Sequence, residues 1–262
     1  MTFKDLIKKL PLSEAGYRQY RKLQHKNASR KAKLEFKKHY EEFCAASDPA
    51  RFSVRWEDRF PILDEKTALT GYDRHYVYHT AWAARCLAET KPARHTDISS
   101  SLYFSALSSA FIPVDFYDFR PADLILSNLQ CKSADLTRLF FDSNSLPSLS
   151  CMHTVEHIGL GRYGDPIDPQ ADLKAMSELQ RVLAPGGNLF FVVPVGKPKI
   201  MFNAHRIYSY DQILEAFSGL NLVKFSLITE NFADGGLMDN PPQAFTDSQD
   251  YGCGCFWFTK KA

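Results

Sequence analysis

The segment Ser177–Val195 constrains the fold of this chain most strongly, because it joins a helix to a buried strand through a Pro-Gly-Gly turn. Apolar residues recur at helical spacing upstream of the turn, with charged residues on the other faces. Pro185 cannot continue that helix, and the two glycines after it permit the positive φ of a helix C-cap. Asn188–Val195 is almost wholly apolar, which is typical of a strand buried on both faces. The segment therefore predicts an α/β crossover in an open, mostly parallel sheet.

The length and composition of the chain predict a cytoplasmic globular protein. The 262 residues are 45% hydrophobic, which is enough for one α/β domain with an extension. No apolar run approaches the roughly 18 residues that a membrane span needs, and the N-terminal segment lacks the apolar core of a signal peptide. The six cysteines are scattered without CxxC pairs, which favours reduced thiols.

The charge is concentrated at the N-terminus. Residues 1–40 hold 12 Lys and Arg against 3 Asp and Glu, a local charge of +9 that leaves −7 for the rest. This pattern fits a solvated helical arm, or a docking surface for an anionic partner such as membrane headgroups or a glycan carrier. No RNA-binding signature accompanies it, so a nucleic-acid partner is not favoured. We expect a basic helical extension over residues 1–60 and an α/β domain over residues 61–262.

The glycine motif Gly159-Leu-Gly161-Arg-Tyr-Gly164 matches the G-x-G-x-x-G fingerprint of dinucleotide-binding proteins. That fingerprint must open a helix whose N-terminal amides hold the pyrophosphate. Pro166 and Pro169 follow at once, so the context does not fit. We interpret the motif as an irregular loop beside the sheet.

Strand and helix patterns alternate from Arg94 to the end of the chain. Five segments with polar strand ends follow one another there, namely His95–Ser101, Val114–Asp118, Ser133–Ser145, Ser148–His157 and the helix–turn–strand segment. Their order resembles the class I S-adenosylmethionine-dependent methyltransferase superfamily over roughly residues 70–260. The resemblance implies a Rossmann-like three-layer α/β/α sandwich with a mostly parallel seven-stranded sheet and an antiparallel last strand.

Two further segments narrow the resemblance. HTVEHIGLGRYGDPIDP and FNAHRIYSYDQIL look like an uncharacterised bacterial subfamily of this fold, a domain of unknown function whose members are often expected near polysaccharide assembly.

The methyl donor, S-adenosylmethionine, is expected at the carboxyl ends of the strands, where the strand order switches. Asp118 at the end of the second strand suits the ribose hydroxyls, because a carboxylate accepts two hydrogen bonds. Asp135 and Leu136 would meet the adenine edge, and His153 the methionine tail. The complete set of expected donor residues is Asp97, Ser99, Ser101, Asp118, Asp135, Leu136 and His153.

The first loop departs from the family pattern of alternating glycines, which let the backbone approach the donor. Ser99, Ser101 and Tyr103 occupy the three glycine positions. A serine can replace a lost amide contact with its hydroxyl, whereas the tyrosine must point away. The alternative is a non-catalytic binding or scaffold protein built on the same fold.

A hydroxyl acceptor requires a general base, and histidine titrates near neutrality. Glu156, His157 and His205 are the catalytic candidates. A structural role for the Glu-His pair is the alternative. His153 and His157 could also hold a metal ion with Cys151 or His205, but we assign no metal site.

The acceptor is expected to be small or glycan-linked and to be methylated on a hydroxyl or a carboxylate. Arg162, Asp165, Asn203 and Arg206 are the substrate-binding candidates, because cations and an amide suit phosphate, carboxylate or sugar groups.

Two patterns are assigned to packing. Tyr72, His75, Tyr76 and His79 recur at helical spacing before the sheet, with a lid over the donor as the alternative. Cys253 and Cys255 are interpreted as strand cysteines.

Overall fold

The computed structural model describes residues 14–261, and the side chains of residues 29–261. The chain divides into two compact units, Met1–Gly71 and Tyr72–Ala262, so the boundary lies later than the expected residue 60. The first unit contains the long helix α2 (Glu14–Ala46) and the 3-10 turn η1 (Trp56–Asp58). The ring of Trp56 packs edge-on against Tyr40, with their centroids 4.8 Å apart.

Helix α2 covers residues 14–46 of the expected helical extension, and between residues 47 and 60 only the 3-10 turn η1 is helical. Residues 1–13 lie outside the described residues. The anionic partner of this segment stays a prediction. Within residues 14–261, the structure contains no helix with the length and apolar character that a membrane crossing requires.

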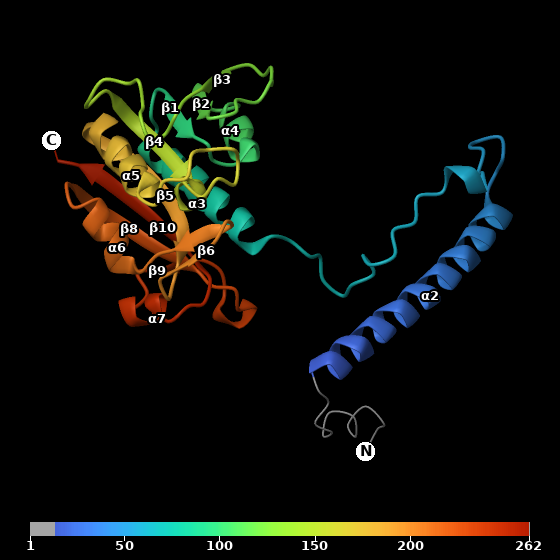
Figure 1. The fold of residues 1–262 in the computed structure, drawn as a ribbon. Helices are drawn as coiled ribbons and strands as arrows, with labels where there is room; N and C mark the ends of the chain where they lie inside the picture. Colours follow the sequence, from blue (N-terminus) through green and yellow to red (C-terminus); the bar gives the residue numbers. More distant parts are fainter. Residues whose placement is uncertain (1–13, 262) are drawn as a thin grey trace. The chain divides into compact units, whose positions relative to one another are not determined.

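The second unit is built on one eight-stranded sheet with the order β3-β2-β1-β4-β5-β10-β8-β9 (Figure 1). Its strands are β1 (His95–Ile98), β2 (Val114–Asp118), β3 (Leu129–Ser133), β4 (Leu146–Met152), β5 (Leu183–Val195), β8 (Leu220–Ile228), β9 (Met238–Asp239) and β10 (Gly252–Lys260). The five strands from β3 to β5 are parallel, and β10 is antiparallel to both β5 and β8. The antiparallel last strand was expected. The expected count of seven strands is wrong, because the two-residue strand β9 pairs with the edge of β8.

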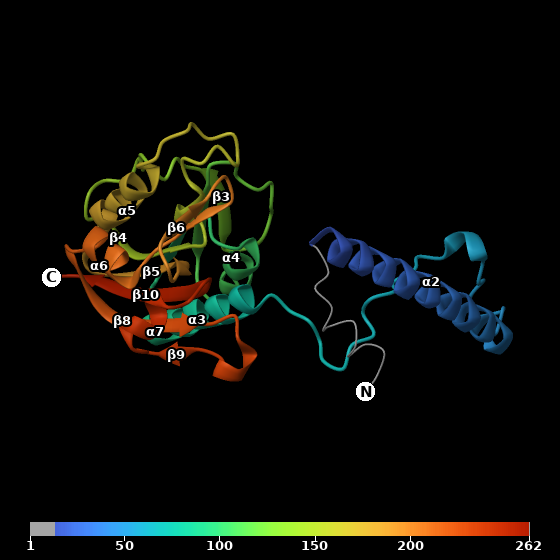
Figure 2. The ribbon, with the colours of Figure 1, turned by 60° about the horizontal axis from the view of Figure 1, so that its bottom comes forward.

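Helices cover both faces of this sheet, and α3 and α5 lie on opposite sides of it in Figure 2. The helices α3 (Arg74–Thr90) and α4 (Leu102–Ser108) share a core with Phe190 and Val192 of β5. The helices α5 (Ala171–Val182) and α6 (Tyr210–Ala216) share the other core with Phe191 and Val193. Successive residues of a strand point to opposite faces, so β5 is apolar on both.

Shorter elements complete the unit. They are η2 (Val155–His157), the hairpin of β6 (Lys199–Met201) and β7 (His205–Ile207), η3 (Phe232–Asp234) and α7 (Gln243–Asp247).

The Pro-Gly-Gly turn differs in detail from the prediction. Helix α5 is capped by Leu183 in an extended conformation, and this residue already pairs with Leu146 of β4. The turn is therefore an irregularity inside β5, where the register shifts, and not a helix C-cap. Gly186 takes the positive φ that was expected, at 72°.

Ser209 is the N-cap residue of α6. The Ser209 hydroxyl accepts a hydrogen bond from the backbone N–H of Gln212 at 3.3 Å, and the Gln212 side chain accepts one from the backbone N–H of Ser209 at 2.9 Å. This reciprocal pair is a capping box. Cys253 and Cys255 both lie in β10, as expected of strand cysteines.

Candidate functional site

A cavity of about 310 Å³ opens at the carboxyl ends of the first four strands. Strand β1 has β2 on one side and β4 on the other, so the strand order switches here, where ligands of open α/β sheets bind. The volume lies at the lower end of the range for small-molecule sites. Five of the seven expected donor residues line this donor cavity, namely Ser99, Asp118, Asp135, Leu136 and His153.

Asp118 and Asp135 are each fixed by a turn of the backbone. One carboxylate oxygen of Asp118 accepts a hydrogen bond from the backbone N–H of Arg120 at 2.7 Å. One oxygen of Asp135 accepts from the backbone N–H of Thr137 at 2.8 Å and from its hydroxyl at 2.7 Å. Across the described side chains, the second oxygen of each carboxylate has no protein donor. These free oxygens suit the hydroxyl and amino groups of an adenosine.

Serines tie the first loop to its neighbouring strands. Ser99 has a positive φ of 57°, and its backbone N–H donates to the carbonyl of Tyr117 at 2.7 Å. The Thr154 hydroxyl donates to the carbonyl of Ser99 at 2.8 Å. The Ser100 hydroxyl accepts from the backbone N–H of Met152 at 3.0 Å. At the first of the three expected glycine positions, the Ser99 hydroxyl also donates to the carbonyl of Tyr117 at 3.2 Å. The loop is thus held in shape by hydrogen bonds of the Ser99 and Ser100 hydroxyls and of the neighbouring Thr154.

Asp97 and Ser101, both expected at the donor, do not line the cavity. Asp97 is completely buried, where it accepts hydrogen bonds from the Ser100 backbone N–H at 3.0 Å and from the Ser150 hydroxyl. Burial raises the pKa of Asp97 to about 6, against the lowering effect of these hydrogen bonds. Ser101 is the N-cap position of α4, and Tyr103 is 84% exposed, so it does point away.

A second cavity of about 470 Å³ lies next to the donor cavity and shares His153 and His157 with it. This acceptor cavity is lined by Tyr76, His153, Glu156, His157, Arg162, Asn203, Ala204, His205 and Tyr251. All three catalytic candidates and two of the four substrate-binding candidates meet there, from η2, the glycine loop and the β6–β7 hairpin.

Glu156 is the most perturbed carboxyl group of the acceptor cavity. It is only 1% exposed, and burial raises its pKa to about 7. One carboxylate oxygen lies 2.8 Å from Nδ1 of His153 and 3.7 Å from Nε2 of His157. The other oxygen is buried without a hydrogen-bond partner among residues 29–261. A carboxyl group with a pKa near neutrality can accept a proton from a substrate.

His157 and His205, which also line the acceptor cavity, are mainly neutral at pH 7. Burial lowers the pKa of His157, and it also lowers that of His205. Nδ1 of His157 lies 2.6 Å from the carbonyl oxygen of Ala204, so it donates there and leaves Nε2 facing Glu156. Nε2 of His205 is buried and finds no partner in the described part of the chain.

The substrate-binding candidates separate into two groups. Arg162 lines the acceptor cavity and donates to the carbonyl of Ala204 at 3.0 Å, and Asn203 lines it as well. Asp165 lines the donor cavity instead, and it shapes the glycine loop by accepting from the backbone N–H of Gly159 at 2.7 Å. Arg206 lines neither cavity, because it is buried against Asp172 at 3.4 Å and donates to the carbonyl of Ile158 at 2.7 Å.

The glycine motif forms the irregular loop that was expected. Gly159, Gly161 and Gly164 all have positive φ, and no helix begins between Gly159 and Ala171. A side chain at Gly159 would meet the carbonyl oxygen of Asp168 at 2.1 Å. The loop lines the donor cavity without offering a helix N-terminus to a phosphate.

Helix α3 packs against the sheet as expected, and it also contributes a residue to the acceptor cavity. Tyr76 stacks on His153 with ring centroids 5.5 Å apart, and His79 meets the same ring edge-on at 4.9 Å. His75 and His79 are buried, whereas Tyr76 stays partly exposed and lines the acceptor cavity. The aromatic spacing of this helix was visible in the sequence, but its contact with His153 was not.

Comparisons with known proteins support the fold. A model of the family described as "Caenorhabditis protein of unknown function, DUF268" matches residues 135–234, and this description does not support the expected bacterial origin. No curated protein matches the chain in sequence. The YcgJ protein of Bacillus subtilis has a similar structure, with 12% identity over 71% of this chain and 99% of that one, at a TM-score of 0.50.

Two named methyltransferases are also among the similar solved structures. The N-methyltransferase NodS of Bradyrhizobium japonicum, in complex with S-adenosyl-L-homocysteine, is 13% identical over 76% of this chain and 93% of its own, at a TM-score of 0.49. A TehB-like S-adenosylmethionine-dependent methyltransferase of Corynebacterium glutamicum is 17% identical over 73% and 90%, at 0.47. The second unit has a mixed α/β fold with a mostly parallel central sheet, and the YcgJ protein shares this Rossmann-like arrangement.

Proposed function

We propose that this chain is an S-adenosylmethionine-dependent methyltransferase that acts on a hydroxyl group of a small or glycan-linked acceptor. The observation that carries the proposal is the pair of adjoining cavities, one at the strand switch point and one around Glu156, which share His153 and His157. A group-transfer reaction needs two adjoining binding sites that bring the reacting groups of the two substrates into contact.

The donor cavity fits the donor by the chemistry of its lining. Asp118 would accept hydrogen bonds from the ribose hydroxyls, and Asp135 with Leu136 would hold the adenine edge. The two free carboxylate oxygens and the apolar side chain of Leu136 supply the required groups. Bound there, the donor would supply a methyl group on a positively charged sulfur.

The acceptor cavity favours a hydroxyl over a carboxylate acceptor, because it contains a base. Glu156, ionised above a pKa of about 7, would take the proton of the acceptor hydroxyl on its unpartnered oxygen. His157 and His205 would orient the acceptor as neutral imidazoles, and Arg162 with Asn203 would bind its polar or anionic groups. A carboxylate acceptor would need no such base.

A transfer assay with a labelled methyl group tests the proposal. Wild-type protein is incubated with labelled donor and with fractions of small metabolites and glycans, and the label in each fraction is counted. We expect transfer into at least one hydroxyl-bearing fraction, with losses in both the Asp118→Asn and the Glu156→Gln variants. Binding of the donor without transfer into any fraction would favour the non-catalytic alternative and contradict the proposal.

A further inference from the structure

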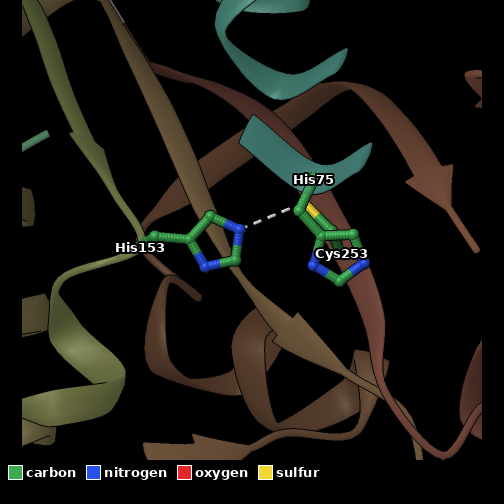
Figure 3. Close-up of side chains that lie close together, drawn as sticks. All are labelled: His75, His153 and Cys253. Carbon is green, nitrogen blue, oxygen red and sulfur yellow. Dashed lines mark hydrogen bonds between the residues drawn. The ribbon is translucent and has the colours of Figure 1, made fainter. Parts of the chain in front are cut away.

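His75, His153 and Cys253 converge from three separate elements, as Figure 3 shows, and His153 also lines the acceptor cavity. His75 lies on α3, His153 follows β4, and Cys253 lies on β10. All three are buried, and one potential ligand atom of each lies within 4.8 Å of the others. We infer that these three side chains bind a divalent transition-metal ion, with zinc as the best fit.

The spacing of the atoms fits zinc. Zinc binds imidazole nitrogen at about 2.0–2.1 Å and thiolate sulfur at about 2.3 Å, so tetrahedral geometry puts nitrogen and sulfur about 3.6 Å apart. Nε2 of His153 lies 3.4 Å from Sγ of Cys253. A movement of a few tenths of an ångström would therefore complete this part of the site. Two imidazoles and a thiolate also favour zinc over magnesium or calcium, which prefer oxygen ligands.

A buried carboxylate orients His153 for this task. Nδ1 of His153 lies 2.8 Å from the Glu156 carboxylate, which can only accept while it is ionised. Nδ1 then carries the hydrogen, and the lone pair of Nε2 faces Cys253. A carboxylate behind a metal-binding histidine fixes its tautomer and raises its basicity, and such partners are typical of metal sites.

His75 supplies a second, independent observation. Its Nε2 is buried and makes no hydrogen bond in the described part of the chain, and an oxygen of Glu230 lies 2.9 Å from it. A buried imidazole nitrogen without a partner costs stability, which a bound ion would recover. Glu230 or a water molecule could take the fourth position, since a cavity of about 290 Å³ lined by His75, His153 and Glu230 reaches this point.

No pattern in the sequence points to this grouping. The metal alternative considered there joined His153 with His157 and Cys151 or His205, whereas the structure brings in a helix residue 78 positions upstream and a strand residue 100 positions downstream of His153. The competing explanation of the short contact is a hydrogen bond from the Cys253 thiol to His153, with no metal.

Cobalt titration of the full chain separates these two explanations. The purified protein is stripped with a chelator, dialysed and titrated with Co²⁺ under reducing conditions. We expect one equivalent to bind with tetrahedral absorption bands and a thiolate-to-cobalt charge-transfer band, and we expect Zn²⁺ to displace it. This measurement needs no methyl donor, so its outcome does not depend on whether the proposed methyl transfer is correct.

Three variants test the proposed site: one removes a ligand, one is its matched control, and one removes the carboxylate that supports His153. Cys253→Ser should abolish the charge-transfer band, whereas Cys255→Ser, equally buried on the same face of the same strand, should retain it. Glu156→Gln should weaken zinc binding by about 10–100-fold, as the loss of a supporting carboxylate does.

Circular dichroism checks that each variant is folded. If Cys253→Ser unfolds, His75→Gln takes its place. We expect His75→Gln to lose the tetrahedral absorption bands. Failure of the wild type to bind one equivalent, or an unchanged spectrum in folded Cys253→Ser or His75→Gln, would overturn the inference.

Discussion

Replacing Asp97 with Asn should make the protein more stable relative to wild type as the pH rises. Asp97 belongs to a buried chain of hydrogen bonds that crosses from β1 to β4. His95 lies 2.8 Å from the hydroxyls of both Ser148 and Ser150, and the Ser150 hydroxyl donates to Asp97. An asparagine can be accommodated if the chain reverses, because its amide can donate to Ser150, which then donates to the other tautomer of His95.

The magnitude follows from the pKa of Asp97, which burial raises from 3.8 to about 6. The folded protein therefore holds this proton more tightly than the unfolded chain does, so ionisation between pH 4 and pH 6 favours unfolding. A shift of about 2 units corresponds to about 3 kcal/mol, and a residue that does not titrate escapes this loss.

Urea unfolding from pH 4 to pH 8 measures the effect. The free energy of unfolding of D97N minus that of wild type should increase by about 2.5 kcal/mol over this range, because a small part of the change lies below pH 4, and nearly all of the increase should be complete by pH 7. The buried histidines contribute to both proteins and cancel in the difference. Asp123→Asn removes an exposed carboxylate and controls for net charge. A difference that stays constant with pH, or one that decreases, would refute the account of this buried network.

Three further predictions concern the two cavities. Glu156→Gln should lower kcat for a hydroxyl acceptor by about 100-fold or more with little change in donor affinity, because it removes the proton acceptor; an unchanged kcat would exclude Glu156 as the base. Tyr103→Ala should leave the Kd of the donor within about 2-fold of wild type, because this side chain is 84% exposed and does not line the donor cavity; a large rise in Kd, seen by calorimetry, would place it at the donor after all. Gly159→Ala should destabilise the protein by at least about 2 kcal/mol more than Gly164→Ala in urea unfolding, because both residues have positive φ but only a side chain at Gly159 meets a backbone oxygen. Equal losses would show that the loop can relax around the added carbon.

Much of the fold was predictable because its signals are local. The helix, turn and buried strand around Pro185 are readable from spacing alone. Strand β3 was not predicted over Leu129–Ser133, since this short strand lies at the edge of the sheet, where only Leu129 is buried.

Candidate site residues were predictable near the carboxyl ends of the strands. Asp118 is the last residue of β2 and Asp135 lies two residues after β3, and both line the donor cavity. Asp97 lies near the end of β1, yet its side chain turns into the sheet toward Ser150, which spacing cannot show. The meeting of His75, His153 and Cys253 depends on how α3 and β10 pack, so no local pattern encodes it.

The central claim is that the cavity at the carboxyl ends of β1 to β4 binds the methyl donor. Isothermal titration calorimetry with S-adenosyl-L-homocysteine, on wild type, Asp118→Asn and the control Asp123→Asn, tests it most directly. We predict one binding site per chain in the wild type and the control, and a Kd about 10–100-fold higher for Asp118→Asn, because hydrogen bonds to a charged group contribute about 1.5–3 kcal/mol. Folded wild-type protein that releases no binding heat at high micromolar ligand, or an unchanged Kd in Asp118→Asn, would contradict the claim.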